Sequence, residues 1–162
     1  MTDGVEFRIH DLDTVVDTMR GMAPRLRNRG LRTAVRRGAM IVRRAARANA
    51  RLIDDPETRA AIWRAIGMQY SRRESKRENG VVYRVGVRGG AREAGQARDS
   101  AATYHWRFLE FGTSKMAAKP FMRRALADNV QRTTNEVVTA LTREIGKLAN
   151  EGAARARGRG SG

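Results

Sequence analysis

The sequence predicts an α+β domain in which a small, mostly antiparallel sheet packs against two long helices, one of them C-terminal. Two long stretches have helical periodicity, one over residues 24–52 and one that begins at Pro120, and residues 81–87 alternate in the manner of a strand. The 162 residues suit a single domain. We expect residues 1–150 to form it and residues 151–162, rich in Arg and Gly, to be a disordered tail.

The N-terminal part contains a predicted strand and a predicted short helix. Residues Val5–Ile9 alternate between apolar and polar side chains, which is typical of a half-buried strand. Asp11 or Asp13 can cap the short helix that follows. Pro24 is well placed at the first turn of the next helix, which we expect to end near Leu52.

The helix over residues 24–52 has an apolar stripe, and arginines cover much of the rest of its surface. Gly30 and Gly38 each lower helix stability by roughly 1 kcal/mol relative to Ala, and Gly30 is a candidate for a break. A solvated amphipathic face is the favoured interpretation of the arginines, and a nucleic-acid-binding helix is the alternative. The stripe consists of Leu31, Val35, Val42, Ala45, Ala46 and Asn49.

The centre of the chain predicts the β region. After the Asp-Asp-Pro stop at residues 54–56, residues 60–70 form either a short helix or the approach to a strand. Residues 71–79 are a charged, hairpin-like connection, and the pair Asn79-Gly80 favours a tight turn. The β-branched run over residues 81–87 is then a strand.

Two further segments complete the middle of the chain. Residues 88–103 combine Gly, Ala and charged residues without periodicity, which predicts a long loop of the kind that is often functional. Tyr104, Trp106 and Phe108 alternate, so we expect an extended segment whose aromatic side chains face a core rather than stack on bases.

A turn at residues 112–114 precedes the predicted C-terminal helix. We expect that helix to begin at Pro120, to run without interruption to about Ala149 and to end at Gly152. Its apolar stripe consists of Phe121, Ala125, Val130, Val137, Leu141, Ile145 and Leu148.

The charge predicts anionic partners. The net charge is +16, and 29 of the 33 basic residues are arginine. Nucleic acid or an acidic protein surface would suit such a charge, and anionic lipid less so, although a GC-rich genome would explain the arginine bias equally well. The absence of cysteine excludes disulfides and Cys-ligated zinc and fits a cytoplasmic protein. We expect neither a signal peptide nor a membrane helix.

No combination of residues predicts an enzyme, a metal site or a cofactor. Nothing in the spacing of the two histidines, His10 and His105, supports an acid–base pair. The sequence also contains neither a phosphate-binding glycine motif nor a nucleophile elbow.

Glu110 is the most distinctive acidic residue. It sits among the apolar residues of segment 108–111, next to the turn, and a carboxylate in such a setting needs hydrogen-bond partners. The candidates are backbone N–H groups of the following turn, the hydroxyls of Thr113 or Ser114, and an arginine of a neighbouring subunit. We favour a structural brace over a catalytic acid.

The segment around Glu110 closely resembles a family of neck and tail-completion proteins, often labelled minor tail components, from long-tailed double-stranded DNA bacteriophages and prophage particles. The resemblance covers about a seventh of the chain, and the chain departs from the family in its high Arg content and in ETRAAIWRAI at residues 57–66. The residues that carry it are Tyr104, Phe108, Glu110, Phe111, Gly112, Thr113, Ser114, Lys115, Pro120 and Phe121.

The resemblance implies a structural virion protein, assembled in the host cytoplasm and located at the head–tail junction. Subunits would form a six-fold or twelve-fold ring and contact connector or stopper proteins and tail-terminator or tail-tube proteins. Loop 88–103 and turn 112–115 would reach adjacent subunits, and a contact with DNA in the channel is left open. A basic protein that contacts nucleic-acid phosphates is the alternative function.

Overall fold

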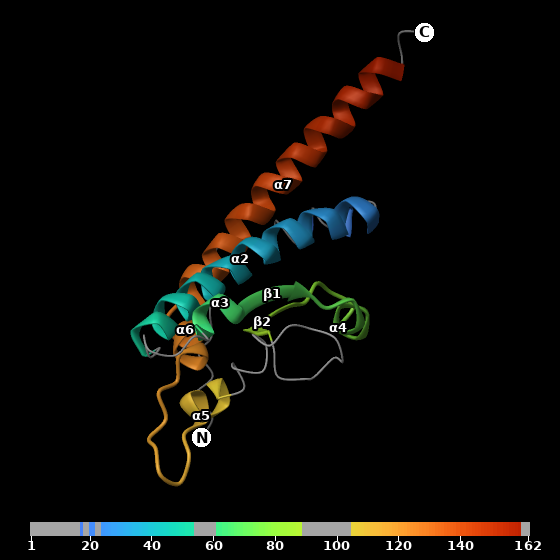
Figure 1. Ribbon diagram of the computed structural model, residues 1–162. Coiled ribbons are helices and arrows are strands. Elements are labelled where there is room, and N and C mark those ends of the chain that lie inside the picture. The colour runs from blue at the N-terminus through green and yellow to red at the C-terminus, as the bar shows by residue number, and fades with distance from the viewer. Residues whose placement is uncertain (1–16, 18–19, 22–23, 54–60, 89–104, 160–162) are drawn as a thin grey trace, which may run out of the picture.

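The computed structural model describes residues 17, 20–21, 24–53, 61–88 and 105–159, and it confirms a fold of mixed helices with a small antiparallel sheet (Figure 1). The elements are α2 (Pro24–Ile53), α3 (Ile62–Ala65), β1 (Ile66–Tyr70), α4 (Arg72–Arg77), β2 (Tyr83–Val87), α5 (Trp106–Phe111), α6 (Met122–Ala127) and α7 (Val130–Arg159).

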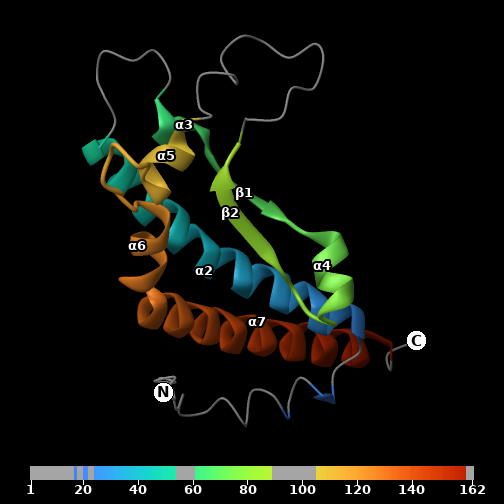
Figure 2. The same cartoon turned by 90° about the horizontal axis from the view of Figure 1, so that it is seen from below.

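The two long helices α2 and α7 run antiparallel and pack through small side chains on α2 (Figure 2). A Cβ atom added at Gly38 would lie 2.5 Å from Cγ2 of Val137, so glycine is required for this close approach. Gly30, a candidate for a break, lies within the continuous helix beside Leu148. The buried face repeats every fourth residue, the spacing of a helix-packing ridge: Gly30, Ala34, Gly38, Val42, Ala46 and Ala50.

The sheet has two antiparallel strands, with Ile66 paired to Val87 at one end and Tyr70 to Tyr83 at the other. Their connection, expected to be hairpin-like, instead contains the helix α4. The hydroxyl of Ser75 accepts a hydrogen bond from the backbone N–H of Val82 at 3.0 Å, which joins this helix to the return strand. The turn expected at Asn79-Gly80 is confirmed, because Asn79 has a left-handed φ of 47°.

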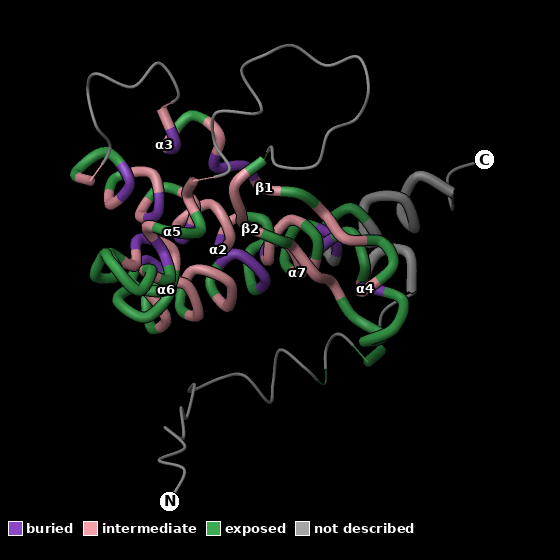
Figure 3. Tube along the Cα trace, turned by 60° about the horizontal axis from the view of Figure 1, so that its bottom comes forward, coloured by how far each residue is buried: buried purple, intermediate pink, exposed green. Residues whose placement is uncertain are grey.

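Helix α2 is the central element of the fold. It contacts β1, β2, α3, α6 and α7, and in Figure 2 it lies between the sheet and α7. The sheet therefore packs mainly on one long helix, whereas we expected both long helices to cover it. The largest buried cluster lies toward the C-terminal half of α2 (Figure 3), where Ala46 and Ala50 meet Ile62, Ile66 and Phe121.

Segment 60–70 was predicted to be either a short helix or the approach to a strand, and it contains both. The single turn α3 leads directly into β1, and the buried side chains of Ile62 and Ile66 follow each other at helical spacing across the junction. The strand expected at Val5–Ile9, the short helix after it and almost all of loop 88–103 lie outside the described residues.

The C-terminal helix differs from the prediction in three ways, the first of which is that it begins at Met122 rather than at Pro120. It is divided at Asp128 and Asn129 into α6 and α7, and the amide of Asn129 donates a hydrogen bond to the carbonyl of Ala125 at 3.0 Å. Short polar side chains compete in this way for backbone groups, so a helix can break without proline. Helix α7 also continues past Ala149 to Arg159, and residues 151–159 of the expected disordered tail are therefore helical.

Candidate functional site

The candidate site is a corner formed by α5, the turn after it and the start of α6, which we call the Glu110 corner (residues 105–123). Its first part was expected to be extended but is the helix α5. At helical spacing, Trp106 and Leu109 pack on the core, while Phe108 and Phe111 are 46% and 63% exposed. The expectation that the alternating aromatics all face a core is therefore wrong. Tyr104 lies outside the described residues.

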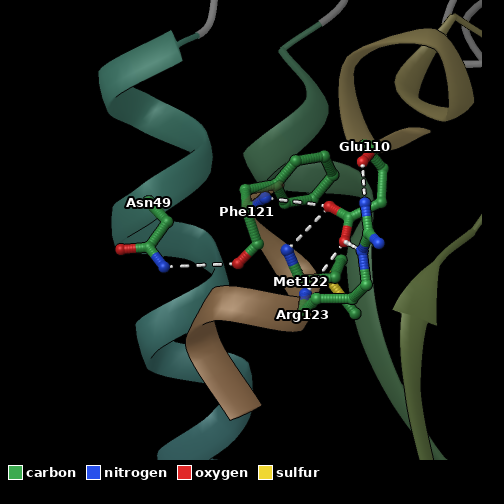
Figure 4. A network of polar contacts seen from close by, with 5 residues as sticks. All are labelled: Asn49, Glu110, Phe121, Met122 and Arg123. Carbon is green, nitrogen blue, oxygen red and sulfur yellow. Dashed lines mark hydrogen bonds and ion pairs between the residues drawn. The ribbon is translucent and has the colours of Figure 1, made fainter. Parts of the chain in front are cut away.

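Glu110 is 1% exposed and holds the corner together (Figure 4). Its Oε2 accepts hydrogen bonds from the backbone N–H groups of Phe121 and Met122 at 2.8 and 2.9 Å. Its Oε1 accepts one from the backbone N–H of Arg123 at 2.9 Å. These amides begin α6 and have no acceptor within that helix. The carboxylate therefore caps α6 across a separation of eleven residues or more in sequence.

The Arg123 side chain completes the arrangement. Its Nε lies 3.3 Å from Oε1 of Glu110, and an NH2 group donates to the backbone carbonyl of Glu110 at 2.6 Å. The structural brace expected of Glu110 is thus present, but with other donors. Within the described chain the carboxylate is held by the start of α6 and by its own chain's arginine, not by the hydroxyls of Thr113 or Ser114.

Phe121 connects the corner to the rest of the fold. Its ring is 1% exposed and lies in the main core cluster. Its carbonyl accepts a hydrogen bond from the side-chain amide of Asn49 on α2 at 3.2 Å (Figure 4). Pro120 precedes it and limits the backbone before α6. The role of Arg123 was not predicted, although a carboxylate near a helix start is a recognisable signal.

Gly112 turns the chain at the end of α5. Its φ of 75° is left-handed, and a Cβ there would lie 2.9 Å from the carbonyl oxygen of Met116 and the nitrogen of Ala118. The following turn is closed by hydrogen bonds between Thr113 and Met116. Ser114 and Lys115 lie exposed at its tip. A bond from the N–H of Lys119 to the carbonyl of Leu109, 2.7 Å long, returns the chain to α5.

The outer side of the corner carries apolar surface. Phe111 and Met116 are both exposed apolar residues of the corner, 63% and 36% exposed respectively. The ring of Phe111 packs at a tilt against Trp106, with 6.5 Å between centroids, and the guanidinium of Arg123 lies 5.1 Å from its centroid. In Figure 1 the loop between α5 and α6 projects away from the long helices. The corner is thus fixed inside and apolar outside.

A second polar region is the arginine-rich surface of α2. Arg43 and Arg47 both direct Nε to the carbonyl of Ile66, at 3.4 and 3.1 Å. Burial lowers the pKa of Arg47, and the nearby cations Arg43, Arg51 and Arg88 lower it further. Positive charges are therefore crowded on this helix.

The described part of the chain shows no sign of a metal site or a membrane helix. Over residues 24–53, 61–88 and 105–159, no three potential metal-binding side chains gather in one place. His10 lies outside the described residues, and His105 directly precedes α5. Among the described helices, none has the length and apolar character needed to cross a membrane.

Comparison with known proteins gives one family. A family model described as "Bacteriophage HK97-gp10, putative tail-component" matches residues 13–112, which is more than half of the chain. The match includes α2, the sheet and α5 and ends at Gly112, so Pro120 and Phe121 lie beyond it. Neither curated proteins nor solved structures give a significant match.

Proposed function

This chain belongs to the HK97-gp10-like family of bacteriophage tail components, and from that premise we propose that it forms a ring at the head–tail junction of a phage or phage-like particle. A tail component is a structural protein of the virion. The finer proposal concerns its place in the neck and its assembly. The observation that carries it is the Glu110 corner, which is fixed by internal hydrogen bonds and exposes Phe111 and Met116.

The corner has the character of a protein contact. Aromatic and Met side chains are enriched in interfaces, and exposed apolar groups gathered in one place often mark them. Because Glu110 has its oxygens occupied by amides of α6, the corner has a defined shape before any partner binds. A preformed surface loses less conformational entropy on association than a flexible loop would.

A ring also needs a second, different surface on each subunit, because head-to-tail contacts join two unlike patches. An apolar groove of about 440 Å³ lies between α2, β2, α6 and α7. It borders the corner at Met122 and Arg123, but none of the residues of α5 or the turn lines it. We propose that the Phe111 side of one copy enters this groove of the next. The groove is lined by side chains that include Val35, Val42, Val85, Leu126 and Val137.

The remaining surfaces would serve the partners above and below the ring. Connector or stopper proteins on the head side, and tail-terminator or tail-tube proteins on the tail side, are the proposed neighbours. Ring closure at six or twelve copies follows from the symmetry expected of a neck. The role is structural, and the one fully buried acid of the corner is held by amides rather than placed to transfer a proton.

Size-exclusion chromatography with multi-angle light scattering, on the purified protein alone and with the products of neighbouring genes, tests the proposal. We expect a ring for the native sequence and a monomer for F111S/M116S with unchanged circular dichroism. The matched control is L52S, because Leu52 is 86% exposed at the end of α2, away from the corner. It should leave the ring intact. A native protein that stays monomeric in both settings, together with a particle whose neck lacks it, would rule the proposal out.

A further inference from the structure

The N-terminal half of α2 faces two grooves whose charged lining residues are all cations. One groove, of about 820 Å³, includes Arg29, Arg32 and Arg36, and the other, of about 800 Å³, includes Arg32 again together with Arg72 and Lys76 of α4. The two grooves share Asn28 and Arg32 and therefore adjoin. We call them together the cationic groove.

The described acids close to this region are already paired. Glu74 of α4 forms a bidentate ion pair with Arg84, and Glu136 of α7 lies 3.8 Å from Arg37. Among the carboxylates of the described ranges, none forms a salt bridge with Arg29, Arg32 or Arg36. Helix α2 itself carries ten arginines and not one Asp or Glu. Within the described residues, Arg29, Arg32 and Arg36 thus carry positive charge that no carboxylate neutralises.

The spacing of these arginines suits a phosphate backbone. At about 1.5 Å of rise per residue, Arg29 and Arg36 lie about 10 Å apart along the helix, with Arg32 between them. One DNA strand places a phosphate about every 3.4 Å along its axis, so three guanidinium groups over this length can follow one strand. The planar fork of Arg also matches phosphate oxygens better than the ammonium of Lys does.

The aromatic residues of the groove favour backbone contacts over contacts with unpaired bases. The guanidinium of Arg32 lies 4.0 Å from the ring centroid of Tyr70 and covers that face. Tyr70 packs in turn against Tyr83, with 5.6 Å between centroids. Single-strand binding relies on open aromatic faces on which bases stack. Here the Tyr70 ring instead holds the Arg32 guanidinium at the groove, and the two tyrosine rings pack against each other.

We propose that the cationic groove binds the sugar–phosphate backbone of duplex DNA. The groove and its charge stand without the proposed function, but the choice of DNA among polyanions rests on it, because a neck is the passage for the genome. The contact is with phosphates, so it carries no sequence preference of its own. It would hold DNA near the ring while leaving it free to slide.

Fluorescence anisotropy with a labelled 30-base-pair duplex, measured over a series of salt concentrations, tests the inference. The test variant is R29Q/R32Q/R36Q. The matched control, R107Q/R132Q/R143Q, removes the same charge from α5 and α7 at residues that do not line the groove. We expect the test variant to bind at least tenfold more weakly at 100 mM salt. The slope of log K against log salt should fall by about 3, since each lost phosphate contact removes about 0.9.

The control should stay within about threefold of the native affinity. Equal losses in both variants, or no binding by the native protein at 100 mM salt, would overturn the inference. Tighter binding to polyglutamate than to the duplex would assign the groove to an acidic protein instead, and preference for single strands of equal length would overturn the duplex assignment. If R29Q/R32Q/R36Q failed to fold, R29K/R32K/R36K would replace it, and that variant should keep the salt slope.

Size-exclusion chromatography with multi-angle light scattering on the same samples separates this inference from the proposed function. A native protein that binds the duplex as a monomer would contradict the ring and leave the groove assigned. A ring that does not bind the duplex would contradict the groove and leave the ring assigned.

Discussion

Two regions of this molecule carry charge in opposite ways. At the Glu110 corner, a carboxylate that is 1% exposed accepts hydrogen bonds from three backbone amides and an arginine. In the cationic groove, Arg29 and Arg36 form no salt bridge with any carboxylate of the described residues. The first charge is satisfied within the chain, and the second has no carboxylate partner among the described residues.

The difference separates charges that stabilise the fold from charges that are available to bind a partner. Removing a satisfied internal charge leaves its buried partners unpaired, so the loss appears as stability. Removing an unneutralised surface charge leaves nothing unpaired, so the loss appears in binding. A substitution therefore shows which kind of charge a residue carries, by lowering either stability or binding.

The largest effect is expected for Glu110→Ala. It leaves three N–H groups of α6 and the Arg123 guanidinium without their acceptor, which should lower the free energy of unfolding by about 3–5 kcal/mol. Urea denaturation followed by circular dichroism measures it. Glu110→Gln keeps the shape and one oxygen and should lose about 2 kcal/mol.

Glu136→Ala is the matched control for an acid outside the corner. Its carboxylate is 37% exposed and lies 3.8 Å from Arg37, so the expected loss is below about 1 kcal/mol. If Glu110→Ala were no more costly than this control, the corner would not be held by its carboxylate.

A smaller effect is expected for Arg123→Ala, which removes the cationic partner and leaves the amide bonds to Glu110 in place. The side chain is 60% exposed, so water can replace part of what is lost, and we expect about 1 kcal/mol. Arg124→Ala is the neighbouring control, because that side chain is 73% exposed and pairs with Asp128 on the surface. Its loss should be about 0.3–0.5 kcal/mol by the same urea titration. Equal losses in the two variants would show that the Arg123 contact is no more than a surface pair.

The sequence predicts best those elements whose signals come from residues close together in the chain. Helix α2 was predicted to within a residue at its end, since Pro24 marks its start and its pattern is continuous. Strand β2 follows from β-branched residues after Asn79-Gly80. The aromatic residues of α5 were predicted to lie in an extended segment, because a short apolar run fits the period of a strand as well as that of a helix. The break at Asn129 was not predicted, because no proline marks it in the sequence.

The candidate site shows the same limit. The need of Glu110 for partners was predictable from the apolar residues around it, and burial of its carboxylate is confirmed. The identity of the donors was not predictable, because the amides of residues 121–123 reach Glu110 only after the chain folds back. Gly38 is a similar case. Its helix cost is visible in the sequence, while its contact with Val137 is visible only in the packed helices.

On the other side of the comparison, Arg29→Gln with Arg36→Gln should leave stability nearly unchanged, within about 0.5 kcal/mol for each substitution. At low salt the unfolding midpoint should rise slightly, because like charges along α2 no longer repel, and 0.5 M salt should cancel the rise. The control is Arg47→Gln, whose Nε bonds the carbonyl of Ile66 and whose loss should be about 1 kcal/mol. A clear loss of stability for R29Q/R36Q would mean that these cations are part of the fold.

The smallest effect concerns the ion pair between Glu74 and Arg84. It lies between the buried Glu110 and the arginines of the groove that have no carboxylate partner among the described residues. Its hydrogen bond from Arg84 lowers the pKa of this carboxyl, with a smaller contribution from the Ser71 hydroxyl, while desolvation acts the other way. A folded pKa below the unfolded one means that the carboxylate contributes stability above the unfolded pKa. That contribution is lost as the pH falls through the folded pKa. Glu74→Gln should therefore have a flatter dependence of unfolding midpoint on pH in the acid range.

Arg84→Gln gives the mirror test, since it removes the first cause of the lowered pKa and leaves Glu74 in place. An NMR titration of the Glu74 carboxyl carbon should then move upward in pH relative to the native protein. Because the pair is exposed, 1 M salt should reduce the difference between the two titrations. Identical titrations in both proteins would show that water already satisfies this carboxylate. The ion pair with Arg84 would then not hold the Glu74 carboxylate. Glu74 would be available to neutralise the arginines of the groove.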